Sequence, residues 1–473
     1  MSARTFCDRG LALARAGGRS AHPRLILAVT ILASTLDYID GSVVNVGLPA
    51  VGRDLHGDAA QLQWVVNAFL LPLSALLLFG GALGDRFGRR RLLTAGLGLF
   101  AAGSVACALA PSLSWLIAAR AIQGLAAAMI LPSSLAILGD SFQGAARSRA
   151  VGIWAATGSV GGALGPVLGG WLIDQVGWRA IFLINLPLAV GAIAIALYAI
   201  PAAPRTASPA RLDLAGAALA TATIAGLTWG LTEGAGPGGW TAPAIAAIVA
   251  GCLFAAAFLW VERRQGERAM TPLALFGSRP IVALNLLTLL LYGAVAAFML
   301  LLPYLLITVV GYSATAAGAA LLPFPLIVGG LSPVFGDLAG RIGARPLLIT
   351  GGLLVAGGLL LGLRASGGAY AADVLPAVAV AAAGMGCAAA PLTSAVLSSV
   401  GPDHTGAASG LNSAVAQLGG VIAVALIGGV LAAKGGAFVD AFRIAIVASA
   451  GACVAAAAAI AVLFRPTSTG RAM

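Results

Sequence analysis

The sequence carries very little charge. Asp, Glu, Lys and Arg make up 9% of its 473 residues, whereas they make up about 25% of a soluble domain. So few charged side chains cannot give a large soluble domain a hydrated surface. The chain is instead 60% hydrophobic, and it contains a series of apolar runs of about 20 residues, the length that crosses a bilayer as a helix. These runs predict a polytopic membrane protein.

The apolar runs are continuous and do not alternate with polar residues. Every backbone amide in hydrocarbon needs a partner, so only helices and closed barrels cross a bilayer. Barrel strands alternate apolar and polar residues, and that pattern is missing here. We therefore expect an all-α polytopic membrane protein.

Residues that carry catalysis or bind metals are also scarce. The five cysteines are scattered without a CxxC pair, which indicates neither a disulfide framework nor a zinc site. The three histidines, His22, His56 and His404, fall in expected tails or loops and form no metal pair. Gly234–Gly239 fits G-x-G-x-x-G, but no strand precedes it, so it does not indicate nucleotide binding. We expect no enzymatic activity, no catalytic residue, no metal and no cofactor.

Fourteen segments are expected to span the membrane, and the middle two separate two sets of six. The spans lie near residues 25–48, 61–83, 92–110, 115–138, 149–172, 179–200, 210–232, 242–262, 281–308, 315–336, 346–364, 371–394, 409–432 and 441–463. The chain is thus divided into an N-terminal tail, a six-helix half, a central segment of linkers with two inserted helices, a second six-helix half and a C-terminal tail, at residues 1–24, 25–200, 201–280, 281–464 and 465–473.

Arginines in the connecting loops predict the orientation. If the N-terminus lies inside, 21 basic residues fall in the tails and inner loops and 5 fall on the outer side. Because Lys and Arg accumulate in cytoplasmic loops, both termini are expected in the cytoplasm, with the protein in the plasma or inner membrane. This distribution explains the net charge of +11 without a nucleic-acid partner.

The sequence contains an internal repeat. Gly81–Leu93 reads GALGDRFGRRRLL, and Gly336–Leu348, 255 residues later, reads GDLAGRIGARPLL, with seven of the 13 positions in agreement. Parallel repeats related by an axis along the membrane normal are typical of transporters that bind substrate between two halves. The repeat therefore predicts a transporter.

Two acids lie in the first apolar run, Leu25–Pro49. Asp37 and Asp40 are three residues apart and share one face of a helix. A carboxylate at the middle of the membrane costs about 2.5–3.5 kcal/mol, so an acid at this depth indicates an ion or proton site. The alternative is that both acids lie near the outer headgroups, at a modest cost.

Arg120 is the only clear basic residue within an expected span, and Gln123 follows on the same face. At 1.5 Å per residue from the outer ends of their helices, Asp40 and Arg120 have depths that match within about one turn. A buried arginine keeps its proton and needs a partner; Asp40 is best placed and Asp37 is second. An acid that separates from the arginine in a dry site binds a proton more readily, which predicts proton coupling. The alternative is a fixed structural ion pair.

The loop after the second span combines glycines, which permit a tight turn, with arginines that anchor the inner face. Asp85 can bond neighbouring helix ends or arginines of this loop. We expect a gating loop formed by Gly81, Asp85, Arg86, Gly88, Arg89 and Arg90. In the second copy Gly340 stands in place of Asp85, so a charged latch is expected in the first half only. The alternative is simple anchoring of the inner face.

Glycines recur along the fifth span. Gly161, Gly165 and Gly169 lie four residues apart and leave one bare face for close helix packing, and Pro166 permits a kink. The whole pattern comprises Gly152, Gly161, Gly165, Pro166, Gly169 and Gly170. It predicts a bend or sliding seam for alternating access, and the alternative is ordinary packing of small residues.

Together these segments resemble the major facilitator superfamily, and specifically its fourteen-helix drug/proton antiporters. The resemblance covers about residues 25–464 and rests on IDGSVVNVGLP (39–49), GALGDRFGRRRLL (81–93), the Arg120–Gln123–Gly124 segment, the Gly152–Gly170 helix and WRAIFLINLP (178–187). It implies the major-facilitator fold, with Asp40 as the membrane acid, Arg120 as the relay arginine, and Asp85, Arg86 and Arg89 in the gating loop. The glycine–proline helix, typical of antiporters, implies export. Gly47, Pro72 and the extra acid Asp37 depart from the family pattern.

The expected function is proton-coupled antiport that exports hydrophobic or cationic small molecules by alternating access, with the proton gradient as its energy source. The alternatives are a symporter or importer of the same fold, or an exporter of a single biosynthetic product. Expected partners are a small-molecule substrate, protons and the lipid bilayer, and the protein is expected to be a monomer. Candidate substrate contacts, each of which could equally be an interhelical bond, are Asn45, Asn67, Asn185, Tyr292, Asn412 and Gln417.

Overall fold

The computed structural model describes residues 22–142, 144–201, 213–235, 238–265, 278–367, 369–400, 405–433 and 435–464. All regular structure in these ranges is helical, as the sequence predicts. Both expected tails, 1–24 and 465–473, lie almost entirely outside the described residues, and so does His404.

Two sets of helices flank a central pair. The first set consists of α2 (Pro23–Asp54), α3 (Ala59–Phe87), α4 (Arg89–Ala108), α5 (Leu113–Ser141), α6 (Gly144–Gln175), α7 (Ala180–Leu183) and α8 (Asn185–Ala199). The central pair is α9 (Leu214–Ala235) and α10 (Ala242–Gln265). The second set consists of α11 (Arg279–Leu305), the π-helical turn η3 (Leu306–Val310), α12 (Ala314–Ala320), α13 (Pro323–Ile342), α14 (Ala344–Leu361), the 3₁₀ turn η4 (Gly362–Gly367), the π-helical turn η5 (Tyr370–Val374), α15 (Leu375–Ser398), α16 (Thr405–Leu426), α17 (Gly428–Ala432) and α18 (Gly435–Leu463).

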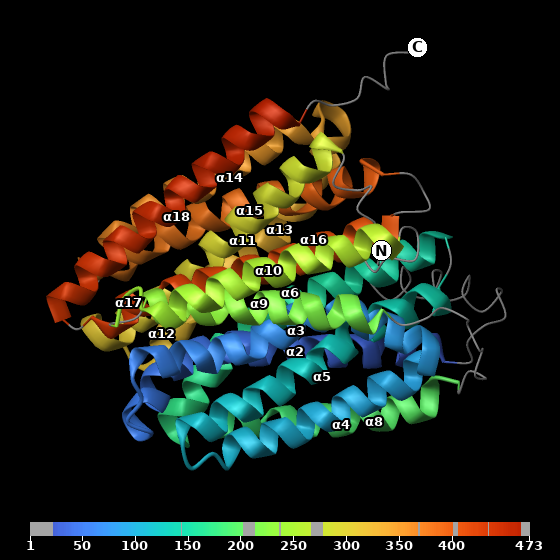
Figure 1. Cartoon of the computed structure of the whole chain (residues 1–473), viewed down its shortest axis with the longest axis horizontal. Helices are drawn as coiled ribbons and strands as arrows, with labels where there is room; N and C mark the ends of the chain where they lie inside the picture. Colours follow the sequence, from blue (N-terminus) through green and yellow to red (C-terminus); the bar gives the residue numbers. More distant parts are fainter. Residues whose placement is uncertain are drawn as a thin grey trace, which may run out of the picture.

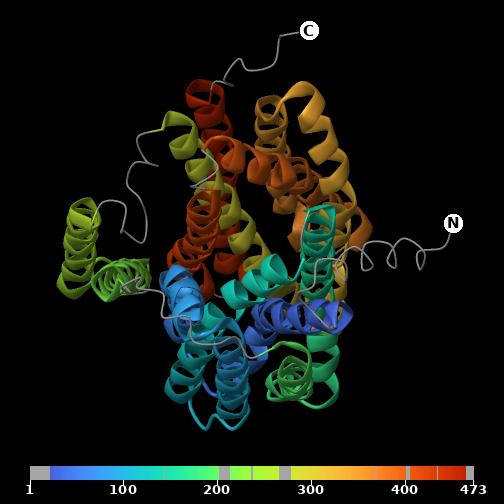
Figure 2. The ribbon, with the colours of Figure 1, turned by 90° about the vertical axis from the view of Figure 1, so that its right-hand side faces the viewer.

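The long helices run side by side (Figure 1), and an end-on view separates them into two bundles (Figure 2). The bundle coloured blue to green is the first half, α2 to α8, and the bundle coloured yellow to red is the second half, α11 to α18. Helix α9 packs against α3 and α16, one helix from each half, and α10 packs on α9. The inserted pair therefore straddles the seam between the halves.

Twelve helices of the described residues are long and apolar enough to cross a membrane. The expected count of fourteen is not supported by this finding. The expected spans 61–83 and 149–172 fall in α3 and α6, helices of 29 and 32 residues that are not among the twelve. The apolar stretch that qualifies in α3 covers only Gln61–Leu77, and several side chains of α6 lie outside the described residues.

The internal repeat reappears in the backbone with its spacing of 255 residues. Gly88, between α3 and α4, has φ +95°, and Gly343, between α13 and α14, has φ +85°. Both glycines lie in the left-handed region that favours glycine, so each copy turns sharply at the same position.

The same spacing also relates two helix starts. Asp58 caps α3 by accepting the backbone N–H of Gln61 at 2.8 Å. Ser313 caps α12 by accepting the backbone N–H of Ala316 at 3.1 Å. Because side chains of this type satisfy the free N–H groups of a first turn, both halves begin their second helical segment in the same way.

Candidate functional site

The structure pairs Asp40 of α2 with Arg120 of α5. Arg120 Nη1 donates to Asp40 Oδ2. The two side chains are 0% and 1% exposed, which makes this the most deeply buried ion pair in the described part of the chain. Burial strengthens the attraction between the charges because little water screens them. Of the two acids on α2, it is Asp40 that the arginine contacts.

Asp40 receives further hydrogen bonds from two amides. Asn185 Nδ2 donates to Asp40 Oδ1 at 2.8 Å, and Gln123 Nε2 donates to the same oxygen at 3.3 Å. Asn185 is the first residue of α8, where the break between α7 and α8 brings it onto α2. Each oxygen of Asp40 therefore accepts at least one hydrogen bond, an environment that suits a charged carboxylate.

The two amides are held by Ser104 of α4, and Gln123 is also held by Arg120. Gln123 Oε1 accepts from Arg120 Nη1 at 2.8 Å, and Gln123 Nε2 donates to Ser104 Oγ at 2.9 Å. Asn185 Nδ2 also lies 3.3 Å from Ser104 Oγ. Ser104 is a participant that the sequence did not reveal, because a lone serine in an apolar helix carries no signal of its own. The result is a closed polar cluster from α2, α4, α5 and α8.

Arg120 also contacts groups outside this cluster. Its Nε donates to the carbonyl oxygen of Val65 on α3 at 3.2 Å. Its guanidinium carbon lies 4.3 Å from the ring centroid of Phe69 and 5.9 Å from that of Phe182. A guanidinium over an aromatic face gains electrostatic attraction, so Arg120 is oriented by α3 and α7 as well as by Asp40.

Asp37 is in a different environment from Asp40. Its side chain is buried, at 6% exposed, and its Oδ1 has no hydrogen-bond partner among the described residues. A buried polar atom without a partner is uncommon in folded proteins. The two acids of α2 therefore differ: both oxygens of Asp40 accept hydrogen bonds, whereas Oδ1 of Asp37 has no partner among the described residues.

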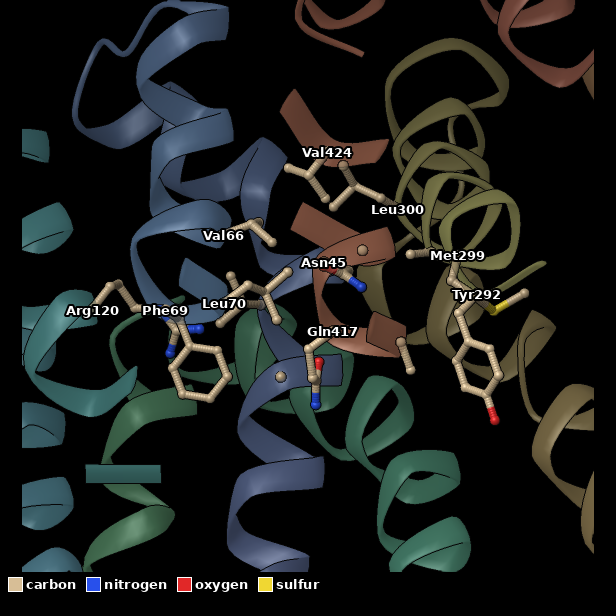
Figure 3. A pocket seen from close by; sticks show the side chains of 15 residues that line it. Asn45, Val66, Phe69, Leu70, Arg120, Tyr292, Met299, Leu300, Gln417 and Val424 are labelled. Atoms are coloured by element: carbon tan, nitrogen blue, oxygen red, sulfur yellow. The ribbon is translucent and has the colours of Figure 1, made fainter. Parts of the chain in front are cut away.

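A cavity of about 210 Å³ lies between the two halves, next to the ion pair. Arg120 and Phe69 lie on one side of it and Tyr292 lies on the other (Figure 3). The wall is mostly apolar, with the amides of Asn45 and Gln417 as its neutral polar groups besides Tyr292. The full lining comes from α2, α3, α5, α11 and α16: Gly41, Val44, Asn45, Val66, Phe69, Leu70, Arg120, Tyr292, Ala296, Met299, Leu300, Ala416, Gln417, Gly420 and Val424.

Three of the six candidate substrate contacts, Asn45, Tyr292 and Gln417, line this cavity. The structure places the other three elsewhere. Asn185 bonds Asp40, and Asn412 donates to Thr288 Oγ1 on α11 at 2.6 Å, an interhelical bond within the second half. Asn67 is fully buried on α3 and is not part of the lining. Sequence position alone could not separate them, because the rotation of each helix decides where an amide points.

The glycine face of α6 packs against α2. A Cβ at Gly161 would lie 2.7 Å from Thr35 Cγ2, and one at Gly165 would lie 2.0 Å from Ser42 Oγ. A Cβ at Gly169 would lie 1.7 Å from Val43 Cγ2. These distances are shorter than any real contact, so the bare face of α6 is required for the observed packing.

The end of the glycine pattern crosses to the second half. A Cβ at Gly170 would lie 2.3 Å from the carbonyl oxygen of Ala314 on α12, and one at Gly318 would lie 2.0 Å from that of Pro166 on α6. The glycines of the two helices thus allow reciprocal backbone contact between the halves. Gly152, the first glycine of the pattern, lies in α6, but its surroundings are outside the described residues.

The expected gating loop forms the turn between α3 and α4. Arg89 Nη1 pairs with Asp140 Oδ2 and donates to the carbonyl oxygen of Ala136 at 3.1 Å, both on α5. Arg90 Nη2 donates to the carbonyl oxygen of Leu197 on α8 at 2.9 Å.

The other members of this loop make local contacts. The guanidinium carbon of Arg86 lies 5.6 Å from the ring centroid of Phe87. Gly81 faces Pro132 of α5, and Gly88 makes the turn itself. The side chain of Asp85 is outside the described residues. In this structure the described contacts tie the loop to its own half.

No group of three or more His, Cys, Asp or Glu side chains that could hold a metal occurs within the described ranges. The chemistry of the cluster is instead that of a buried charge pair with amide and hydroxyl partners beside an apolar cavity. Such an arrangement can bind a small molecule and respond to it electrostatically.

Comparison with known proteins identifies the fold and the relatives. The family model described as Major Facilitator Superfamily matches residues 30–424 and 284–472. Multidrug resistance protein Stp of Mycobacterium tuberculosis (strain CDC 1551 / Oshkosh) is 35% identical over 410 residues, which cover 86% of this chain and 76% of that protein. Cephamycin export protein CmcT of Amycolatopsis lactamdurans is 36% identical over 421 residues, which cover 87% and 86%. The tetracenomycin C resistance and export protein of Streptomyces glaucescens is 31% identical over 434 residues, which cover 90% and 79%.

Solved structures agree on the fold. A peptide transporter, POT, in complex with sulfate matches with a TM-score of 0.68 at 16% identity, over 92% of this chain and 93% of that one. A bacterial homologue of the human lysosomal transporter Spinster, in an inward-facing and occupied conformation, matches with a TM-score of 0.67 at 16% identity, over 94% and 97%.

Proposed function

The chain belongs to the major facilitator superfamily, and on this premise we propose that it exports lipophilic small molecules in exchange for protons. One observation supports this proposal above all others: Arg120 both pairs with Asp40 and lines the cavity between the halves. A molecule that enters the cavity therefore meets the partner of a buried acid. Binding and proton transfer are then linked through a single guanidinium.

The coupling works through electrostatics. When Arg120 stays on Asp40, the carboxylate keeps its charge; when a substrate or a movement of α5 draws the arginine away, the acid is left in a dry site and binds a proton more readily. Each state of the carrier then favours either substrate or proton. Alternation arises from rocking of the two halves about the cavity.

The lining supports a lipophilic substrate. Phe69, Met299 and Leu300 supply apolar surface, and Asn45 with Gln417 supply a few polar contacts, the usual composition of a small-molecule site. The names of relatives point the same way, since cephamycin and tetracenomycin C exporters are among them. The class of substrate includes drugs and antibiotics, in neutral or cationic form.

Several finer features belong to the same proposal. We propose that α3 and α6 also cross the bilayer, which gives fourteen spans; their lengths of 29 and 32 residues support this. The excess of arginine in one set of loops supports cytoplasmic termini in the plasma or inner membrane. The loop at Gly88 would act as the inner gate, and the α6 glycines would form the seam that slides. The carrier would act as a monomer, with the proton gradient as its only energy source and without a cofactor.

Everted membrane vesicles with an imposed proton gradient test this function. Ethidium and tetracenomycin C are added separately, and collapse of the gradient is followed with a pH-sensitive dye. We expect the wild type to dissipate the gradient with at least one compound and Asp40→Asn to fail. The control is Asp440→Asn, because Asp440 is an exposed residue of α18 that forms an ion pair with Arg443 of the same helix, at 3.7 Å. Normal transport by Asp40→Asn, or no response of the wild type to any compound in a wider panel, would contradict the proposal. Accumulation of the compound in the direction of proton flow would indicate the alternative, a symporter.

A further inference from the structure

A second ion pair of the first half joins the end of α2 to the segment before α7. Asp54, the last residue of α2, accepts through Oδ2 from Arg179 Nη1 at 2.6 Å and from Trp178 Nε1 at 2.9 Å. Arg179 Nη2 also donates to the carbonyl oxygen of Ala110, beyond the end of α4, at 3.2 Å. We call Asp54, Trp178 and Arg179 the Asp54 latch. The latch connects three segments that lie far apart in the sequence.

The Asp54 latch is more than an exposed ion pair. Asp54 and Arg179 are 48% and 44% exposed, and a pair of that kind contributes little on its own because water screens it. Trp178, however, is buried, and the guanidinium carbon of Arg179 lies 4.4 Å from its ring centroid. The ring attracts the cation, and the carboxylate accepts from both partners with charge-assisted bonds. The latch therefore fixes the position of the Trp178 ring.

The ring of Trp178 leads inward to the buried ion pair. Its centroid lies 6.2 Å from that of Phe182 with the planes at 90°, an edge-to-face contact. Phe182 is fully buried on α7, and its ring faces Arg120, with 5.9 Å between the ring centroid and the guanidinium carbon. A continuous series of side chains thus connects Asp54 at the surface with Arg120 at the cavity.

The short helix α7 carries this connection to Asp40 as well. It packs on both α2 and α4. Gly47 of α2 leaves room for Ile181 of α7, because a Cβ at Gly47 would lie 3.1 Å from Ile181 Cδ1. Only Ile184 separates α7 from Asn185, the first residue of α8, whose Nδ2 donates to Asp40 Oδ1 at 2.8 Å. The position of α7 therefore sets the position of this amide.

We propose that Asp54 is a positioning residue for the buried cluster, although it does not line the cavity. By holding the segment before α7, it keeps the Phe182 ring on Arg120. Through the start of α8 it also keeps Asn185 on Asp40. This inference rests on the proposed proton-coupled export, in which the Asp40–Arg120 pair links substrate to proton. A carboxylate at the surface then controls the geometry of a site that it does not touch.

Cys107 of α4 lies in the cluster and can report on it. Its thiol is fully buried and donates to Gln123 Oε1 at 3.2 Å. Because α7 packs on α4, we expect a displacement of α7 to expose this thiol. Cys453, fully buried on α18 of the second half, reports loosening of the whole protein, and the exposed Cys252 is an internal standard.

The test measures the rate at which N-ethylmaleimide modifies Cys107 in the purified full-length protein. Mass spectrometry of peptides quantifies each cysteine separately. The variants are Asp54→Ala, Asp54→Glu and Trp178→Phe, with Asp440→Ala as the control because Asp440 is an exposed acid of another helix, α18. Thermal unfolding shows whether each variant is folded, and gradient collapse in everted vesicles is measured in parallel.

We expect Asp54→Ala to raise the modification rate of Cys107 about 5- to 30-fold, the range that corresponds to the loss of one or two hydrogen bonds to a charged group. The rate at Cys453 should stay unchanged, and gradient collapse should slow. Trp178→Phe keeps a ring beside Phe182 but loses the N–H donor, so its effect should be smaller. Asp54→Glu retains the carboxylate and should lie nearer the wild type than Asp54→Ala does.

Three results would overturn the proposal. The first is a wild-type rate at Cys107 in folded Asp54→Ala, and the second is equal acceleration at Cys107 and Cys453, which indicates general loosening. The third is faster modification of Cys107 with unchanged gradient collapse, because the geometry of the cluster would then not matter for transport. If Asp54→Ala does not fold, Trp178→Phe decides by the same comparisons. If the wild type collapses no gradient with any compound, the proposed function fails, whereas the rates at Cys107 still show whether the latch holds the cluster.

Discussion

Asp174, next to the last residue of α6, caps the first turn of α12 through Thr315. Its Oδ2 accepts the backbone N–H of Thr315 at 2.9 Å and the Thr315 hydroxyl at 2.5 Å. Its Oδ1 accepts the backbone N–H of Ala314 at 3.3 Å. A carboxylate at a helix N-terminus satisfies free N–H groups and faces the positive end of the helix dipole. This cap is unusual because the acid belongs to one half and the helix to the other.

A second contact between the halves lies at the same end of the molecule. Gln63 Nε2, near the start of α3, donates to the carbonyl oxygens of Val424 and Ala425, near the end of α16, at 2.5 and 3.1 Å. With cytoplasmic termini, this end is the outer one. One contact joins α6 to α12 and the other joins α3 to α16, so the two halves of the described structure are joined across this end.

The first prediction concerns this cap. Asp174→Ala removes the side chain that accepts the backbone N–H groups of Ala314 and Thr315 in the first turn of α12, and the loss of a helix cap costs about 0.5–2 kcal/mol. We expect the balance between closed and open outer ends to shift toward open by about 2- to 30-fold. Spin labels at the exposed positions Leu109 and Val309, one from each half, would report longer distances. Unchanged distances, with Asp440→Ala as the control, would show that the cap does not hold this end closed.

The second prediction concerns the seam between α6 and α12. A Cβ at Gly318 would meet the carbonyl oxygen of Pro166 at 2.0 Å, so Gly318→Ala must force the two helices apart. Overpacking of this kind costs about 1–3 kcal/mol, and we expect a lower thermal unfolding temperature together with slower transport. Gly162→Ala is the matched control. Gly162 lies on α6, the helix that Gly318 contacts, and a Cβ at Gly162 would meet nothing within 4 Å. Equal behaviour of the two variants would contradict the role of the seam.

The third prediction concerns the cavity. Ala296 of α11 lines it, and Ala296→Trp places a large ring in a space of about 210 Å³. We expect probe binding to be lost while the protein stays folded, because the ring occupies the cavity and none of the residues that bond Asp40 is replaced. Ala256→Trp on the exposed face of α10 is the control. Binding titrations with ethidium and thermal unfolding distinguish a filled site from a misfolded protein, and normal binding by Ala296→Trp would place the site elsewhere.

Much of the molecule could be predicted from local properties of the sequence. Apolar runs show which segments enter the membrane, and the spacing of 255 residues between Gly88 and Gly343 shows that the chain contains two copies of one plan. A lone arginine in an apolar run needs an acidic partner. The rise of 1.5 Å per residue gives the depth of each side chain below the end of its helix, and so shows which acid lies at the level of the arginine. The pairing of Arg120 with Asp40 was accessible for this reason.

The remaining features depend on how each helix is rotated and tilted, which is set by side chains on other helices. The tertiary structure pairs Arg120 with Asp40, and it alone could show that Asp37 Oδ1 has no hydrogen-bond partner among the described residues. Likewise, only the structure showed that Asn185 bonds Asp40 and does not line the cavity, and that Asn412 bonds Thr288 of α11. A rotation of α2 by one residue, about 100°, would exchange such roles without any change in hydropathy. The sequence by itself determined that the chain spans a membrane, that it is built from two related halves and that it needs a buried charge pair. Which side chains meet was decided by tertiary packing, because α2 packs against the glycine face of α6 and the break before α8 brings Asn185 to Asp40.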